Sequence, residues 1–222
     1  MVHTIISWVV GSILLGITLI AAWLYRKRDQ SVNIKNPYTT FWRRFWASSV
    51  DSFVIMPFLF SIKLIAQFDL PIIITLLLFS IQSLAFISYT IYFHGKWGQT
   101  LGKRVFRVQV VQDKSQNPIT YKEAVLRDGI MLLIVIVGLI EIFYFLISGN
   151  LNTSTLLHEL RVGATEIDRD LRFAEKFALP WMILELITML TNKKRRALHD
   201  YIAGTVVVCV PKSTPQHTST EA

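Results

Sequence analysis

Three carboxylates lie inside apolar stretches of the sequence, where such groups could bind or relay a cation. Asp51 and Glu185 lie six residues from one end of their stretches, about 9 Å along a helix, and Glu141 lies twelve residues in, about 18 Å. A carboxylate at mid-bilayer costs at least about 2.5 kcal/mol and usually faces a cavity or a partner. The acids therefore favour two interpretations: a hydrated path for cations or protons, or buried pairs with Arg44 or Arg127.

A second candidate for chemistry is the pair His199 and Asp200, in the segment "KKRRALHDYIAGTVVVCV". The sequence contains no nucleophile-elbow serine or cysteine signature that would complete a hydrolase triad. The segment "HELRV" lacks the second His of a zinc-protease helix, and "GQTLGKR" lacks the first Gly and the Ser or Thr of a phosphate-binding loop. We therefore expect no enzyme activity, no catalytic residue, no metal and no cofactor, and a structural role for His199.

The elements that must position these residues are long apolar segments. Hydrophobic residues make up 52% of the 222-residue chain and charged residues only 17%, which indicates a bilayer rather than water as the solvent. A spanning helix needs about 20 apolar residues to cross a core of about 30 Å. The sequence predicts an all-α membrane protein, a bundle of about five transmembrane helices with a small cytoplasmic two-stranded element. The predicted spans are residues 4–25, 45–66, 71–93, 129–149 and 173–191.

The net charge of +8 is distributed over alternate loops. Residues 26–44 hold six Lys or Arg, residues 94–127 hold seven, and the chain after residue 191 holds five. Residues 67–70 hold none, and residues 150–172 hold three beside four acids. The positive-inside rule then places the N-terminus outside and the C-terminus in the cytoplasm. We therefore expect the basic residues to meet anionic lipid headgroups at the cytoplasmic face, and we expect no nucleic-acid partner.

Short elements are predicted on the cytoplasmic side. Residues 105–110 alternate in polarity, which is typical of a strand, and "TVVVCV" at 205–210 predicts a second strand. We expect the two strands to pair, because a lone strand leaves its backbone groups unsatisfied. Thr120 and Glu123 have the spacing of a capping box at the start of a helix. On the outside, residues 150–172 could form an amphipathic helix along the membrane surface.

Three segments together resemble the RDD family of bacterial membrane proteins: "FWRRFWASSVD" at 41–51, "GQTLGKRVFRVQVV" at 98–111 and "RALHDYIAGTVVV" at 196–208. Arg44, Asp51 and Asp200 match the Arg and the two Asp for which the family is named. The sequence departs from the family pattern at Arg107 and Gln109, where Gly and Arg would be expected. The resemblance implies a polytopic domain in a bacterial plasma membrane, with transport as the usual proposal and sodium/proton exchange suggested for some members.

The resemblance divides the chain into three parts. Residues 1–40 would be an additional N-terminal membrane helix with a basic linker, residues 41–211 the RDD-like membrane domain, and residues 212–222 a disordered tail. The candidate ion path consists of Asp51, Glu141 and Glu185. The candidate cytoplasmic motif consists of Gly98, Thr100, Gly102, Lys103, Arg104 and His199.

Specific contacts can be expected for the three signature residues. Arg44 and Asp51 are seven residues apart, which places them on nearly the same helix face but too far apart to touch. We expect Arg44 to meet phosphate headgroups and Asp51 to find a partner on another helix. Asp200 is expected to accept a hydrogen bond from Lys103 or Arg104.

The sequence leaves two classes of function open. The first is an ion-linked transporter or transporter component that exchanges cations and protons. The second is a non-catalytic scaffold or assembly factor that binds lipid or a partner membrane protein. Five spans without visible inverted repeats are few for a self-contained carrier, so transport would require a homo-oligomer or a partner membrane protein.

Overall fold

The computed structural model does not describe every part of the chain. The described residues are 16–18, 20, 21, 23, 24, 36–68, 70–149, 152, 154–157 and 173–210. Most of the predicted first span at 4–25, most of the loop at 150–172 and the whole tail at 212–222 therefore lie outside the described residues. The remaining predictions can be compared with the fold.

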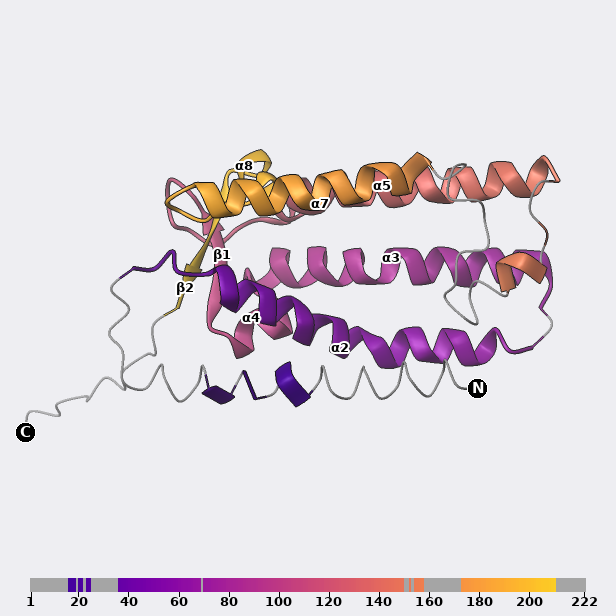
Figure 1. The fold of residues 1–222 in the computed structure, drawn as a ribbon, viewed down its shortest axis with the longest axis horizontal. Helices are drawn as coiled ribbons and strands as arrows, with labels where there is room; N and C mark the ends of the chain where they lie inside the picture. Colours follow the sequence, from indigo (N-terminus) through magenta and orange to yellow (C-terminus); the bar gives the residue numbers. More distant parts are fainter. Residues whose placement is uncertain are drawn as a thin grey trace, which may run out of the picture.

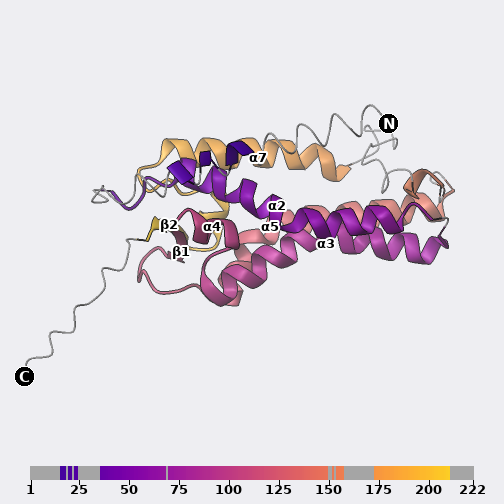
Figure 2. The same ribbon diagram turned by 90° about the horizontal axis from the view of Figure 1, so that it is seen from below.

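Three long helices form the body of the molecule: α2 (Phe41–Ile65), α3 (Ile72–Trp97) and α5 (Tyr121–Ile147). They run side by side along the long axis, as both views show (Figure 1 and Figure 2). With 25, 26 and 27 residues, each is about 37–40 Å long, which exceeds the hydrocarbon core of about 30 Å. Few of their apolar side chains are buried, and the others are exposed or half-buried, which is the arrangement that suits a lipid solvent.

The number of spans differs from the sequence prediction. The described part of the chain has three helices that are long and apolar enough to cross a membrane, where the sequence predicted five. The predicted fifth span is the helix α7 (Phe173–Thr191), but its 19 residues include Glu175, Lys176 and Glu185. Those three charges distinguish it from the other long helices, because each raises the cost of burial in hydrocarbon.

Four short elements gather at one end of the long helices: α4 (Leu101–Val105), β1 (Val108–Gln112), α8 (Leu198–Ile202) and β2 (Thr205–Cys209). We call residues 98–112 and 193–209 the cap. The cap lies where α2 and α5 begin and where α3 and α7 end (Figure 1). Strands β1 and β2 pair antiparallel, with Val110 opposite Val207, which confirms the predicted pairing.

The cap has its own apolar core, and it is continuous with the first turn of α5. The capping box predicted at Thr120 and Glu123 is confirmed, and it fixes the point where the chain leaves the cap and enters α5. The buried side chains of this core come from both strands and from the start of α5. They are Val108, Val110, Ile119, Ala124, Val207 and Cys209.

The first strand begins three residues later than the alternation predicted. Residues 101–105 form the helix α4, and Phe106 is buried against Ala47 of α2 rather than lying in the sheet. Arg107 then takes a φ of 52°, in the left-handed region that favours glycine, before β1 begins at Val108. This is the position at which the family resemblance led us to expect Gly.

Candidate functional site

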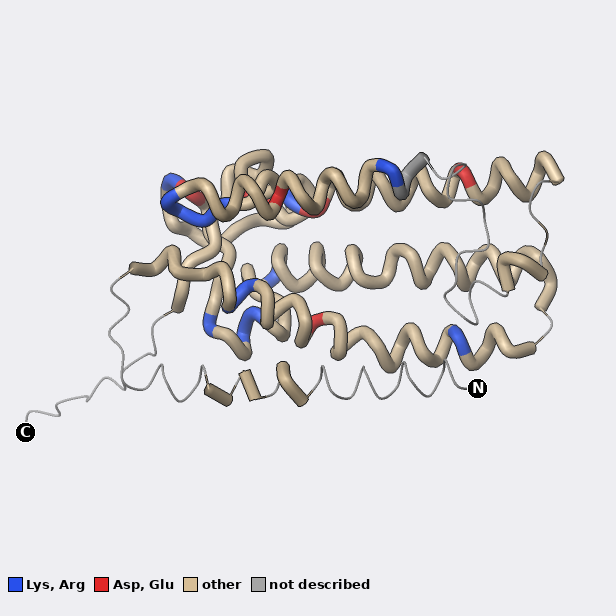
Figure 3. The backbone as a smooth tube through the Cα atoms, viewed as in Figure 1, with Lys and Arg blue, Asp and Glu red and all other residues tan. Residues whose placement is uncertain are grey.

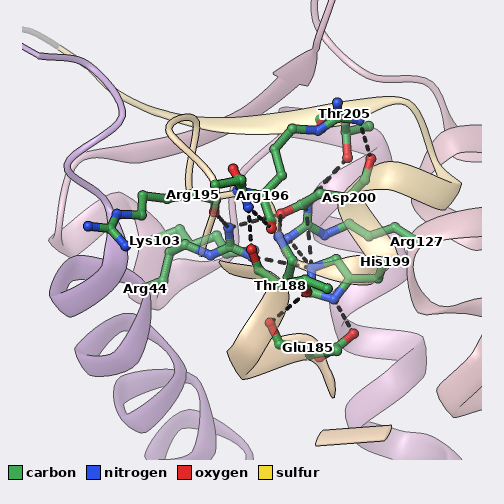
Figure 4. Close-up of polar contacts among 12 residues, drawn as sticks. Arg44, Lys103, Arg127, Glu185, Thr188, Arg195, Arg196, His199, Asp200 and Thr205 are labelled. Atoms are coloured by element: carbon green, nitrogen blue, oxygen red, sulfur yellow. Dashed lines mark hydrogen bonds and ion pairs between the residues drawn. The ribbon is translucent and has the colours of Figure 1, made fainter. Parts of the chain in front are cut away.

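Asp200 lies at the centre of a buried polar network in the cap. Its side chain is fully buried and accepts hydrogen bonds from Arg127 of α5, from Arg44 of α2 at 2.9 Å, and from the backbone N–H of Ala197 at 3.0 Å (Figure 4). Burial alone would raise the pKa of this carboxyl group. The positive charges of Arg127 and Arg44 together have the larger effect and hold the pKa below its ordinary value. Asp200 is therefore ionised.

His199 extends this network to α7. Its Nε2 atom lies 2.9 Å from Arg127 and 3.3 Å from Arg44, and its Nδ1 atom is hydrogen-bonded to Glu185 (Figure 4). A guanidinium group can only donate, so Nε2 must accept and Nδ1 must carry the proton that is donated to Glu185. Burial lowers the pKa of His199. The neutral ring thus connects the carboxylate of α7 to the two arginines of α2 and α5.

Arg196 fixes the remainder of the C-terminal half of the cap. Its guanidinium donates to the backbone carbonyls of Thr205 at 2.9 Å and Asp200 at 3.0 Å, and it forms an ion pair with Asp113 at 3.1 Å. It also lies 4.1 Å above the ring of Tyr201. These contacts hold α8 and β2 together and attach them to the turn that follows β1.

Asp51 occupies a separate buried site, in contact with the N-terminal half of the cap. Its side chain accepts hydrogen bonds from the Thr100 hydroxyl at 2.6 Å, the Gly102 N–H at 2.7 Å and the Tyr89 hydroxyl at 2.7 Å. The Tyr89 hydroxyl in turn accepts from the N–H of Leu101 at 3.1 Å. Asp51 is therefore the group that holds the first turn of α4 against α2 and α3.

Gly102 permits this close approach. A Cβ atom at that position would lie 2.0 Å from the carbonyl oxygen of Ala47 and 3.0 Å from Cγ of Asp51. A larger residue would therefore push α4 away from α2. Thr100 contributes as the N-cap of α4, and Gly98 ends α3 with a φ of 66°.

Lys103 points back from α4 toward the ends of the long helices. Its Nζ atom lies 2.5 Å from Nε2 of His94 in α3, and the Nδ1 atom of that ring faces Asp128 of α5. Burial, followed by the positive charge of Arg127, lowers the pKa of Lys103 well below its ordinary value. Arg104 in the same helix is exposed, and its guanidinium lies 5.4 Å from the ring of Trp97.

Two of the expected contacts are wrong. Arg44 is not directed to lipid headgroups: its side chain is only 9% exposed and pairs with Asp200. The cationic partners of Asp200 are Arg44 and Arg127 rather than Lys103 or Arg104. The expectation that Asp51 finds its partner on another helix is confirmed by Tyr89 of α3.

The structure brings only some of the candidate ion-path residues together. Glu185 lies in the network of Asp200, and Asp51 lies in the neighbouring site under α4. Glu141 is fourteen residues beyond Arg127 in α5, which is about 21 Å along the helix and places it toward the opposite end. In the described segments, no group of three or more His, Cys, Asp or Glu residues is arranged to hold a metal ion.

The side chains that contribute to these sites but were absent from the candidate set include those of Tyr89, His94, Asp113, Arg127, Asp128 and Arg196. Arg127 was considered only as one possible partner of an intramembrane acid. The adjacent charges at 127 and 128 directly precede an apolar run, and that position was the available signal. Tyr89 and His94 gave no comparable signal, because a tyrosine or histidine near the end of a membrane helix is common at an interface.

Comparison with known proteins gives a family match. The RDD family profile matches residues 38–204, which include α2, the cap up to residue 204, and both Asp51 and Asp200 with the two arginines that pair with Asp200. No curated protein and no solved structure matches the chain. The matched region covers more than half of the sequence, and Arg44, Asp51 and Asp200 lie within it. The chain therefore belongs to the RDD family and is a multi-pass membrane protein with three candidate membrane-spanning helices.

Proposed function

We propose that this protein is an ion-linked transporter, or a component of one, that exchanges protons and other cations across a bacterial plasma membrane. The observation that carries the proposal is the connected set of buried titratable groups at one end of the long helices. Glu185, His199, Arg127 and Asp200 form one such set, contributed by α5, α7 and α8. Ionisable groups buried in membrane proteins are costly, and they commonly mark ion pathways and proton relays.

We assign roles to the carboxylates according to the hydrogen bonds that each accepts. Both oxygens of Asp51 and of Asp200 accept strong hydrogen bonds, so these two carboxylates serve to hold the cap. Glu185 is an acid that accepts a hydrogen bond from the neutral ring of His199, and the two residues lie at the junction of α7 with the cap. We therefore assign ion-coupled chemistry to Glu185 and His199 and a positioning role to the signature residues.

Orientation is proposed from charge. Figure 3 shows that the Lys and Arg residues of the described segments gather mainly at the cap end of the molecule. The positive-inside rule then favours a cytoplasmic cap and C-terminus, with the N-terminus outside and with residues 4–25 and α7 as additional spans. Impermeant thiol labelling in a Cys209→Ser background tests this. A Cys at Ser154 should react in intact cells and a Cys at Ser115 should not, and the reverse pattern would contradict the orientation.

Transport itself is tested with the full chain in liposomes that carry a sodium or proton gradient, read with an internal pH dye. We expect wild type to dissipate the gradient and Glu185→Gln to reduce the flux to that of protein-free liposomes. Glu141→Gln is the matched control, because it removes a carboxylate from the opposite end of α5 and should retain flux. Absence of flux from correctly oriented wild type would contradict the proposal.

The second candidate function is a non-catalytic scaffold that binds anionic lipid or a partner membrane protein. A patch of cationic and aromatic side chains at the cap end favours it: Lys96 lies 4.7 Å above the ring of Trp97 and 5.4 Å above that of Tyr92. Such groups suit the headgroup region. A scaffold would show binding to vesicles containing anionic lipid together with no ion flux. Under either function we propose that the protein has no enzyme activity and works as a homo-oligomer or with a partner.

A further inference from the structure

A second titratable cluster joins the cap to α3 and α5. Lys103 of α4, His94 of α3 and Asp128 of α5 lie in a row, with 2.5 Å between Nζ of Lys103 and Nε2 of His94. The Nδ1 atom of His94 lies 3.7 Å from Oδ2 of Asp128. His94 is 3% exposed, so the ring lies between a cation and an anion with little access to solvent.

The contact between Nζ of Lys103 and Nε2 of His94 is compatible with two protonation states of equal total charge. In the first, the Lys103 ammonium donates to Nε2, so the ring is neutral and its proton is on Nδ1, facing Asp128. In the second, the proton has moved from Nζ to Nε2, which leaves a neutral amine that accepts from an imidazolium. Only one N–H bond breaks and one forms, and Asp128 is the counter-ion of the charged ring.

The side of the His94 ring that faces Asp128 makes no hydrogen bond to the described residues. Nδ1 of His94 and Oδ2 of Asp128 are both buried, and neither has a hydrogen-bond partner among the described residues. Buried polar atoms without partners are rare because each costs about 1–3 kcal/mol. A positive charge on the ring would strengthen its attraction to Asp128 across the 3.7 Å gap. Protonation of the ring would therefore draw Nδ1 of His94 and Oδ2 of Asp128 together.

The surrounding charges set the balance between holding and releasing the proton. Arg127 and Arg44 face Lys103 and oppose its positive charge, whereas Asp51 and Asp128 favour it. Lys103 and Arg127 oppose a positive charge on His94, whereas Asp128 favours it. Burial and the two arginines lower the pKa of Lys103 well below its ordinary value, which brings proton release nearer to neutral pH.

We propose that Lys103, His94 and Asp128 form a binding site for one exchangeable proton, which moves between Nζ of Lys103 and Nε2 of His94. Its role in coupling rests on the transport function proposed above, but proton binding at the site does not. Because Lys103 is in α4 and its two partners are in α3 and α5, the position of the proton affects how the cap is attached to these helices.

The first test needs no variant. Full-length protein with ¹⁵N-labelled lysine and histidine is placed in lipid nanodiscs, and the resonances of the Lys103 amine and the His94 ring are followed during a pH titration. We expect both to change with one shared midpoint below the ordinary lysine value of about 10.4. An ammonium at Lys103 that persists above about pH 10 and titrates independently of His94 would overturn the proposal.

The second test separates the site from the transport function. His94→Gln keeps an oxygen that can accept from Lys103 but cannot carry the proton, and Lys122→Gln, exposed in α5, is the control. We expect His94→Gln to melt near the wild-type temperature with proton flux reduced to background, and the control to match wild type in both. If Lys103 and His94 of wild type titrate with one shared midpoint but wild type shows no proton flux, the proton site is supported and the transport proposal is contradicted. Unchanged flux in His94→Gln would overturn the role of the site in coupling, whereas independent titration of Lys103 and His94 in wild type would overturn the site itself. If the variant fails to fold, the titration of wild type still decides.

Discussion

Replacement of Asp51 by Asn tests whether this signature residue holds the cap or binds a transported ion. The carboxylate is 3% exposed and receives three hydrogen bonds of 2.6–2.7 Å, from Thr100, Gly102 and Tyr89. Asn is nearly isosteric and keeps one acceptor oxygen for Tyr89 and Gly102. The substitution therefore removes the negative charge and forces the Thr100 hydroxyl to reorient, without opening a cavity.

The expected cost can be worked from these three bonds. A hydrogen bond to a charged group contributes about 1.5–3 kcal/mol, against about 0.5–1.5 kcal/mol for a neutral one. Loss of the charge should thus remove about 1 kcal/mol per bond, or about 3 kcal/mol from the free energy of unfolding. For a chain of this size, 1 kcal/mol corresponds to about 2–4 °C, so we expect the melting temperature to fall by about 6–12 °C.

The assay is thermal unfolding in detergent, read beside ion flux in liposomes. Ser52→Ala is the matched control, because Ser52 is the next residue in α2, is exposed, and donates its hydroxyl to the carbonyl of Ser48 in its own helix. The control should melt like wild type. If Asp51→Asn also melts like wild type, the reasoning is refuted, and loss of flux in that case would identify Asp51 as an ion-binding carboxylate.

Two further predictions concern the attachment of α4. Gly102→Ala should destabilise the protein by about 1–3 kcal/mol, because its Cβ would overlap the carbonyl oxygen of Ala47. Gly129→Ala, at a helix position with open space around it, should stabilise by up to about 1 kcal/mol, and equal melting of the two variants would contradict the packing. The folded protein resists protonation of Lys103, so its stability should rise with pH between the lowered pKa of Lys103 and the unfolded value of about 10.4. Across that pH window, the melting temperature of Lys103→Met should change less with pH than that of wild type. An equal pH dependence in the two proteins would count against burial of the Lys103 amine.

Much of the fold was predictable because its signals are local. The apolar runs predict α2, α3 and α5, the β-branched run at 205–210 predicts β2, and the Thr120–Glu123 spacing predicts the start of α5. Helix α4 was not predicted. It has only five residues, and its first turn is satisfied by Asp51, which is 49 residues away from Thr100. An element that depends on such a distant contact has no complete signal in its own sequence.

The candidate site was predictable in its residue types but not in its pairs. Arg44 and Asp200 are separated by 156 positions, and either could have paired with several opposite charges. Coulombic attraction between sites is not encoded in spacing along the chain, so the choice of Arg127 and Arg44 as partners depends on how α2, α5 and α8 are packed. The headgroup expectation for Arg44 was wrong for this reason, because the cap covers the helix end at which a lipid phosphate would otherwise lie.

The seven-residue spacing of Arg44 and Asp51 acquires a physical meaning from the fold. Both residues lie on nearly the same face of α2, two turns apart. Arg44 binds the carboxylate of Asp200 in α8, whereas Asp51 binds the first turn of α4. One helix face therefore holds both halves of the cap, and each attachment is a buried charge whose loss would be costly. A shift of α2 along its axis would have to move α4 and α8 together or break one of these contacts, which couples the membrane helix to the whole cap.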